Sequence, residues 1–163
     1  MPIIAAEPLR AVVRAMCSAA GSTEYEAELV ADNLVMANLS GHDSHGVGML
    51  PAYFDNLHAG GLKVNQHAEV VRDEGAVLGV DGNAGFGQVI GKESMDIAIA
   101  RAKERGVCVL AIRNSHHLCR IGAWAEQCAA AGLVSMHHTN VTGHGGSVAP
   151  VSYTHLTLPT RRF

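Results

Sequence analysis

Apolar residues recur every three or four positions through the first third of the chain, which is the spacing of amphipathic helices. The clearest stripe contains Leu29, Leu34 and Ala37, with polar residues between them. Thr23 and Glu26, just before this stripe, match a capping box, in which each side chain bonds the backbone amide of the other residue. Helices are expected over residues 6–20, from about 23 to 40, and over 51–58.

The pattern changes after residue 60, where short apolar runs alternate with longer amphipathic segments. Such runs are typical of strands, and strands that alternate with helices favour parallel pairing in a layered α/β architecture. We therefore predict a helical domain over 1–65 and part of an α/β domain over 66–150. The expected strands are 69–72, 76–81, 107–112 and 133–137, and the expected helices are 85–105 and 121–131.

The 163 residues are 48% hydrophobic and 17% charged, which is typical of a globular protein and not of a disordered one. The net charge is −3 without a basic block, so neither nucleic acid nor an anionic membrane is an expected partner. No apolar run approaches the roughly 20 residues that span a bilayer, and Glu7 and Arg10 argue against a signal peptide. The four cysteines form no Cys-x-x-Cys pair, which favours free thiols and a cytoplasmic location.

Three glycines, Gly85, Gly87 and Gly91, are reminiscent of a dinucleotide-binding fingerprint because they follow an expected strand and open an expected helix. The third glycine comes one residue late, and no acidic residue ends the next strand about 20 residues on. A tight turn with close packing of the helix on the sheet explains the glycines as well. A Rossmann cofactor site is therefore the weaker interpretation.

The strongest candidate for chemistry is the segment 113–122, which follows an expected strand and contains the adjacent His116 and His117. Ligand sites gather at the carboxyl ends of strands in open α/β sheets. Histidine, with an ordinary pKa of about 6.5, exchanges a proton near neutral pH. The alternative is a polar turn whose side chains only satisfy backbone groups. A second cluster at 41–46, which contains Ser44 and His45, favours a shared site.

On an extended segment, His116 and His117 would point to opposite faces, so only one of them could face a substrate. Asp43 is interpreted as a turn cap rather than as a base. Three histidines further along the chain, His137, His138 and His144, match no zinc-ligand spacing, so no metal site is predicted.

Together, the two clusters resemble the type-2 malate/L-lactate dehydrogenase family, and within it a hydroxycarboxylate dehydrogenase B-like branch. The likeness covers about residues 8–150, which is under half of a typical member. It is carried by Gly41-His42-Asp43-Ser44-His45-Gly46, Phe86-Gly87-Gln88-Val89, Asn114-Ser115-His116-His117 and the run from Trp124 to Gly132.

The resemblance implies a homodimeric oxidoreductase that uses NAD or NADP to interconvert 2-hydroxy and 2-oxo acids. It also implies a fold that is not Rossmann, in which a helical domain packs on a three-layer α/β cofactor domain with a mixed sheet. His117 matches the family's proton donor and acceptor, and Ser44 and His45 match a pair that lines the same site. Most cofactor contacts of members lie beyond residue 150, which leaves Asn140 and Gly143 as the candidates within this chain.

Several positions depart from the family pattern. Met49 stands where members usually have an arginine, so the expected anchor for a substrate carboxylate is missing. We predict that Arg120 replaces it, with Asn114 as a second substrate-binding residue, although a surface or interface ion pair explains Arg120 equally well.

Cys119 stands where most members have glycine, and we interpret it as a small packing residue rather than a nucleophile. Residues 151–163 are interpreted as a foreign tail, so the chain is expected to be an inactive N-terminal fragment.

Two other functions stay open at this point. A metal-dependent hydrolase would use His42, His45, His116 and His117 as ligands, and stoichiometric zinc in the purified protein would favour it. A non-catalytic module would keep its histidines for structure and bind a partner through its helical face.

Overall fold

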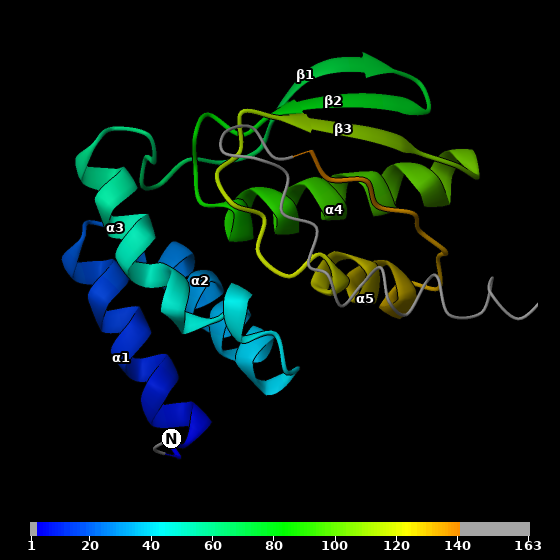
Figure 1. Cartoon of the computed structure of the whole chain (residues 1–163). Coiled ribbons are helices and arrows are strands. Elements are labelled where there is room, and N and C mark those ends of the chain that lie inside the picture. The colour runs from blue at the N-terminus through cyan, green and yellow to red at the C-terminus, as the bar shows by residue number, and fades with distance from the viewer. Residues whose placement is uncertain (1–2, 141–163) are drawn as a thin grey trace, which may run out of the picture.

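The N-terminal helical domain contains three helices, α1 (Ala6–Ala19), α2 (Glu24–Leu39) and α3 (Leu50–His58), as the apolar periodicity predicts. The structure, a computed structural model, describes residues 3–140 (Figure 1). Two short 3-10 turns, η1 (Asp43–His45) and η2 (Val47–Met49), join α2 to α3. The apolar stripes of the helices face one another and form the main core with the start of α4. The fully buried members include Val13, Val30, Leu34, Tyr53, Phe86 and Val89.

The capping box expected at the start of α2 is only half formed. The amide of Glu26 donates to Thr23 Oγ1 at 3.4 Å, but the amide of Thr23 donates to Asn65 Oδ1 at 2.7 Å instead of to Glu26. The buried Glu26 carboxylate accepts hydrogen bonds from Ser22 Oγ at 2.7 Å and from the amide of Asn65 at 2.9 Å. A tertiary contact therefore replaces the local one, and it ties α2 to the loop that leads into the sheet.

The α/β part contains a mixed sheet of three strands, β1 (Glu69–Glu74), β2 (Val77–Asp81) and β3 (Val109–Arg113), in that spatial order. Strand β2 pairs parallel with β3, and α4 (Gly87–Arg105) connects the two. The pairing of β1 with β2 is antiparallel, so the sheet is mixed, as the family resemblance implied. Only two residues separate these strands, and a crossover to a parallel neighbour needs a dozen or more.

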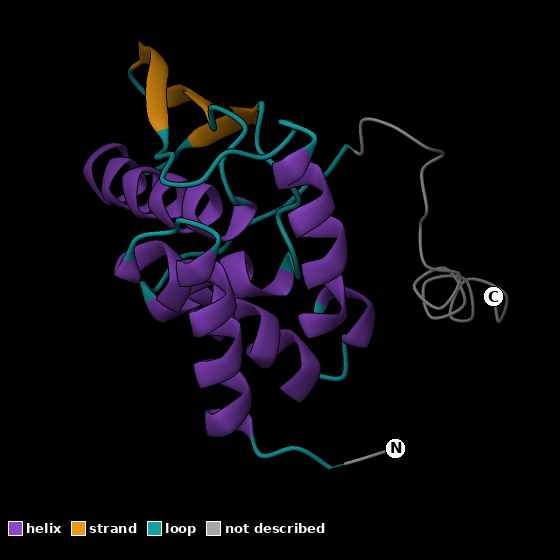
Figure 2. Cartoon of the chain, turned by 90° about the vertical axis from the view of Figure 1, so that its left-hand side faces the viewer, coloured by secondary structure: helices purple, strands orange, loops and turns teal. Residues whose placement is uncertain are grey.

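Helix α5 (Gly122–Ala130) packs on α4 through a second apolar cluster that contains Met95, Trp124 and Cys128. A Cβ atom at Gly91 would lie 2.6 Å from the Trp124 ring, so this glycine allows the close approach of the two helices. The helices lie on one side of the sheet (Figure 2). None of the helices in residues 3–140 is long and apolar enough to cross a membrane.

The strand expected at 133–137 is wrong, because residues 133–140 have no regular secondary structure. Val134 is 100% exposed and Met136 is 83% exposed, whereas Leu133 packs on the cluster between α4 and α5. An apolar run forms a strand only where a neighbouring strand satisfies its backbone groups. Strand β3 pairs with β2 on one side only, and residues 133–140 do not pair with its other edge.

Candidate acid–base site

The histidine segment leaves the sheet at the end of β3 and crosses the N-terminus of α4. Asn114 turns the chain away from the strand with a left-handed φ of 51°. Gly82 and Gly87 make room for the segment, since a Cβ atom at Gly87 would lie 2.1 Å from the carbonyl oxygen of His117. The glycine-rich turn before α4 is therefore filled by the protein's own backbone, as the close-packing interpretation of these glycines predicts.

The ring of His117 is held by residues from two other elements. Its Nδ1 lies 2.8 Å from the hydroxyl oxygen of Tyr53, a fully buried side chain on α3. The same oxygen accepts a hydrogen bond of 3.0 Å from Nε2 of Gln88, which is buried in the first turn of α4. Nε2 of His117 bonds to no side chain within residues 3–140.

The second cluster meets the first at this point, as predicted from the sequence. The ring centroids of His45 and His117 lie 5.2 Å apart. Ser44 Oγ is 2.9 Å from Nδ1 of His45, and the thiol of Cys119 donates to the carbonyl oxygen of His45 at 2.9 Å. Two histidines and a serine from segments more than 60 residues apart thus face one small region of space.

The environment keeps these imidazoles neutral. Burial, followed by repulsion from the neighbouring His45 and His116, lowers the pKa of His117 to about 4. Burial, followed by the nearby His42, also lowers the pKa of His45. Burial raises the pKa of Tyr53, so its hydroxyl stays protonated. At neutral pH, His117 therefore has a free lone pair on one ring nitrogen and a proton on the other.

His116 does not point away from His117, so the expectation of opposite faces is wrong. The Tyr53 ring contacts both imidazoles, with centroids 5.3 Å from His116 and 6.0 Å from His117. The alternation of an extended strand does not apply, because β3 ends at Arg113 and the following segment is irregular. Nδ1 of His116 is buried without a hydrogen-bond partner among the described residues. The edge-on contact with Tyr53 makes His116 a packing residue.

The two predicted substrate-binding residues are engaged in other contacts. Nδ2 of Asn114 donates to Asp81 Oδ1 at 2.9 Å. Both terminal nitrogens of Arg120 bind the carboxylate of Glu126, at 2.8 and 2.6 Å, and the Arg120 side chain is only 11% exposed. This is the ion pair that the sequence left open as the alternative for Arg120. Its role as a carboxylate anchor stays a prediction.

The loop that carries Ser44 and His45 is braced from α2. Asp43 Oδ1 accepts a hydrogen bond of 2.6 Å from Asn38 Nδ2, and Asn38 Oδ1 accepts one of 2.9 Å from the amide of Val47. Asp43 therefore fixes a turn, in line with the sequence interpretation. Met49 packs on the main core as a partly buried side chain.

The described residues do not form a phosphate-binding site for a nicotinamide cofactor. The glycine-rich turn is filled by residues 114–117, and Arg113 beside it is paired with Asp81 Oδ2 at 2.9 Å. Of the two predicted cofactor contacts, Asn140 is exposed and Gly143 lies outside the described residues. The described part of the chain thus shows no cradle for the cofactor.

Within residues 3–140, no group of three or more His, Cys, Asp or Glu side chains could hold a metal ion. The hydrolase alternative therefore gains no support from the arrangement of the four histidines that it requires.

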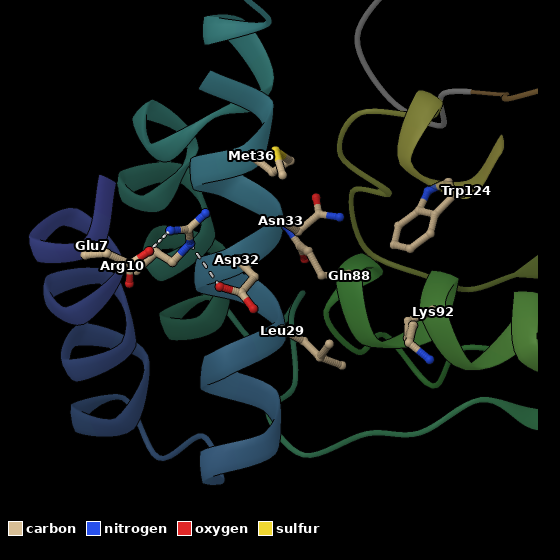
Figure 3. A pocket seen from close by; sticks show the side chains of 9 residues that line it. All are labelled: Glu7, Arg10, Leu29, Asp32, Asn33, Met36, Gln88, Lys92 and Trp124. Carbon is tan, nitrogen blue, oxygen red and sulfur yellow. Dashed lines mark hydrogen bonds and ion pairs between the residues drawn. The ribbon is translucent and has the colours of Figure 1, made fainter. Parts of the chain in front are cut away.

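A pocket of about 510 Å³ lies between the helical domain and the pair α4 and α5 (Figure 3). It is separate from the histidines except for Gln88, which lines one wall and reaches Tyr53 on the other side. Both of its cations are already paired, Arg10 with Glu7 and Asp32, and Lys92 with Asp96. The remaining lining residues are Leu29, Asn33, Met36 and Trp124.

Sequence reasoning missed Tyr53 and Gln88 as members of the site. The signal for Gln88 was present, because a polar residue stands between Phe86 and Val89 at a position that must be buried at the start of a helix. A buried amide needs a hydrogen-bond partner. Nothing local identifies Tyr53 as that partner, since 35 positions separate the two residues.

Comparisons with known proteins identify the family of the chain. The profile of the malate/L-lactate dehydrogenase family matches residues 4–158, a range that ends inside the segment 151–163. Hydroxycarboxylate dehydrogenase B of Escherichia coli strain K12 is 49% identical over 138 residues, which are 85% of this chain and 38% of that protein. A malate dehydrogenase of Pyrococcus abyssi is 38% identical over 74% of this chain and 33% of its own length.

Solved structures show the same relationship. A putative malate/lactate dehydrogenase from E. coli superposes with a TM-score of 0.80 at 47% identity, over 81% of this chain and 37% of that one. The malate dehydrogenase of Pyrococcus horikoshii gives a TM-score of 0.75 at 36% identity, over 79% and 37% of the two chains. The chain spans less than two fifths of the length of these relatives. From the family profile and these likenesses, the chain belongs to the malate/L-lactate dehydrogenase family.

Proposed function

We propose that this chain is the acid–base part of an oxidoreductase that interconverts 2-hydroxy and 2-oxo acids with NAD or NADP. The observation that carries the proposal is the setting of His117. The ring is neutral, is held at Nδ1 by a buried tyrosine, and has Nε2 free of described partners beside His45 and Ser44. Relatives named malate, L-lactate and hydroxycarboxylate dehydrogenases support the substrate class.

The chemistry requires one proton and one hydride to move. In oxidation, the O–H bond of the 2-hydroxy acid breaks and its proton goes to Nε2 of His117, while a C=O bond forms at the same carbon. The nicotinamide, when bound, takes the hydride that leaves this carbon. A positioned general base of this kind contributes typically about 10² to 10⁴-fold in rate. In reduction, His117 returns the proton to the oxygen.

His45 and Ser44 are proposed to hold the substrate oxygen next to His117. Their mutual contact of 2.9 Å orients the His45 ring, and its lowered pKa leaves it uncharged. An uncharged imidazole can donate a hydrogen bond to the oxygen without competing for the proton. Asn114 and Arg120 complete the proposed substrate contacts, and Asn140 and Gly143 the cofactor contacts within this chain.

The assembly and completeness of the active protein are also proposals. We propose that the active form is a cytoplasmic homodimer and that residues 1–163 alone are inactive, with residues 151–163 foreign to the fold. The coverage of 38% of the E. coli relative supports the proposed inactivity alone, because most of that protein's length has no counterpart here, whereas the family profile extends to residue 158, within the segment proposed to be foreign.

The test uses a chimera in which residues 1–140 precede the part of E. coli hydroxycarboxylate dehydrogenase B that this chain does not cover. Oxidation of NADH and of NADPH is followed with a series of 2-oxo acids, and zinc is measured in the same sample. We expect 2-oxo acid-dependent oxidation of at least one cofactor. A folded chimera that turns over none of the acids and holds stoichiometric zinc would favour the hydrolase instead.

A further inference from the structure

The contact between Gln88, Tyr53 and His117 restricts where the proton of the neutral imidazole can reside. A phenol hydroxyl has a single hydrogen to donate. Gln88 Nε2 donates to the Tyr53 oxygen at 3.0 Å, and the same oxygen lies 2.8 Å from Nδ1 of His117. With the amide in this orientation, Tyr53 directs its own hydrogen at Nδ1, which must then accept. The single proton of neutral His117 is thus placed on Nε2.

We propose that Gln88 is a positioning residue that, through Tyr53, keeps the proton of neutral His117 on Nε2 and so sets the resting site to receive a carbonyl oxygen. An Nε2–H group donates a hydrogen bond to the oxygen of a 2-oxo acid. The other tautomer would instead present a lone pair to the hydroxyl group of a 2-hydroxy acid, so proton acceptance at Nε2 during oxidation starts from that tautomer, after the proton of neutral His117 has moved to Nδ1. This inference rests on the proposed function for its substrate, but the tautomer itself does not depend on activity.

The surroundings make the amide of Gln88 well suited to this role. Gln88 is 1% exposed, Tyr53 is 0% exposed, and the Tyr53 ring is held edge-on by Phe86, so the hydroxyl cannot turn to water. Oε1 of Gln88 is buried with no hydrogen-bond partner among the described residues. The amide nitrogen is held by Tyr53, and the Gln88 side chain also interacts with the thiol of Cys119, whereas its Oε1 has no partner among the described residues. Rotation by half a turn would offer oxygen to Tyr53 and move the His117 proton to Nδ1.

Nuclear magnetic resonance of the 163-residue chain labelled with nitrogen-15 histidine tests the inference, because the shifts of the two ring nitrogens report the tautomer. The His117 signals are assigned by His117→Gln. We expect the wild-type ring to be mainly the Nε2–H form near neutral pH. Gln88→Leu frees the hydroxyl hydrogen of Tyr53, and the ratio of the two tautomers should fall by about 2- to 10-fold, the range expected from one hydrogen bond.

Gln88→Glu gives the sharpest result. A carboxylate can only accept, so it takes the Tyr53 hydrogen and the Tyr53 oxygen must then accept from Nδ1 of His117. The ring should change to mainly the Nδ1–H form. Tyr53→Phe removes the relay while keeping the ring packing, and it should bring the ratio close to that of Gln88→Leu. Gln66→Glu is the matched control, because Gln66 bonds only to the carbonyl oxygen of Val64, and it should leave the wild-type ratio unchanged.

A wild-type ring that is mainly Nδ1–H would overturn the inference. So would a wild-type ratio that persists in both Gln88→Leu and Gln88→Glu. No substrate or cofactor enters these measurements, so their failure leaves the dehydrogenase proposal standing. Conversely, a chimera without turnover leaves the tautomer result intact.

Discussion

The hydroxyl oxygen of Tyr53 lies 2.8 Å from Nδ1 of His117, although 64 positions separate the two residues. The contact joins the helical domain to the segment that follows β3, so the proposed proton carrier depends on both parts of the chain. A buried hydrogen bond of this kind adds about 0.5–1.5 kcal/mol to stability and fixes one ring nitrogen. Its loss should therefore affect both folding and the acid–base properties of the ring.

The stability of the chain should fall as the pH falls from about 6.5 to about 4. The pKa of His117 is lowered to about 4 in the folded state, so in this range the unfolded chain binds a proton that the folded chain does not. The contribution of neutral His117 to stability is fully present above the ordinary histidine pKa of about 6.5. It is lost as the pH falls through the pKa that His117 has in the folded state.

Replacing His117 by glutamine should reduce the pH-dependent change in the free energy of unfolding by about 1–3 kcal/mol, allowing for partial exposure of the ring. The measurement is urea unfolding at pH 7 and at pH 4.5 for both proteins. His58→Gln, at the exposed end of α3, is the matched control and should keep the wild-type pH dependence. An equal loss of stability on acidification in wild type and His117→Gln would refute the assignment.

Cys119→Gly should be more stable than Cys119→Ala by about 1 kcal/mol. Cys119 has a φ of 58°, a left-handed conformation that costs an L-residue roughly 1–2 kcal/mol and glycine almost nothing. Both substitutions remove the buried thiol and its hydrogen bond to His45, so the comparison isolates the backbone. Urea unfolding of the two variants provides the measurement. If the alanine variant is the more stable one, the left-handed backbone conformation does not determine the relative stability of substitutions at Cys119.

Arg120→Met in the chimera should raise the KM for the acid by roughly 10- to 100-fold if Arg120 holds the substrate carboxylate, as expected from losing about 1.4–2.8 kcal/mol of binding. Glu126→Gln is the informative partner, because it frees the guanidinium from its ion pair and should lower the KM. Met49→Arg combined with Arg120→Ala should recover part of the lost affinity. A KM that changes in none of these variants would mean that Arg120 serves only its ion pair.

The helices and most strands could be predicted from the sequence because their signals are local. The stripe through Leu34 requires only that one face of α2 be buried, and the structure buries it. The predictions that failed all depended on contacts between distant parts of the chain. Residues 133–137 have the apolar pattern of a strand but do not pair with the free edge of β3, and Glu26 accepts from the amide of a loop residue 39 positions away instead of from the amide of Thr23.

For the candidate site too, local motifs could be predicted from the sequence, but contacts between distant residues could not. The motifs around His45 and His117 indicated a shared site, and the two rings do lie together. The residues that orient the chemistry, Tyr53 and Gln88, could not be paired from the sequence because their contact joins α3 to α4 in space. The opposite-face argument for His116 failed because it assumed a strand where the backbone is irregular.

The most direct test of the acid–base assignment compares His117→Ala with His116→Ala in the chimera. His117 is bonded to Tyr53 and has a free Nε2, whereas His116 contacts the same tyrosine only through its ring. We predict that His117→Ala lowers kcat by about 10² to 10⁴-fold with little change in the Kd of the nicotinamide cofactor, and that His116→Ala lowers kcat far less. A larger loss of kcat in His116→Ala than in His117→Ala would contradict the assignment.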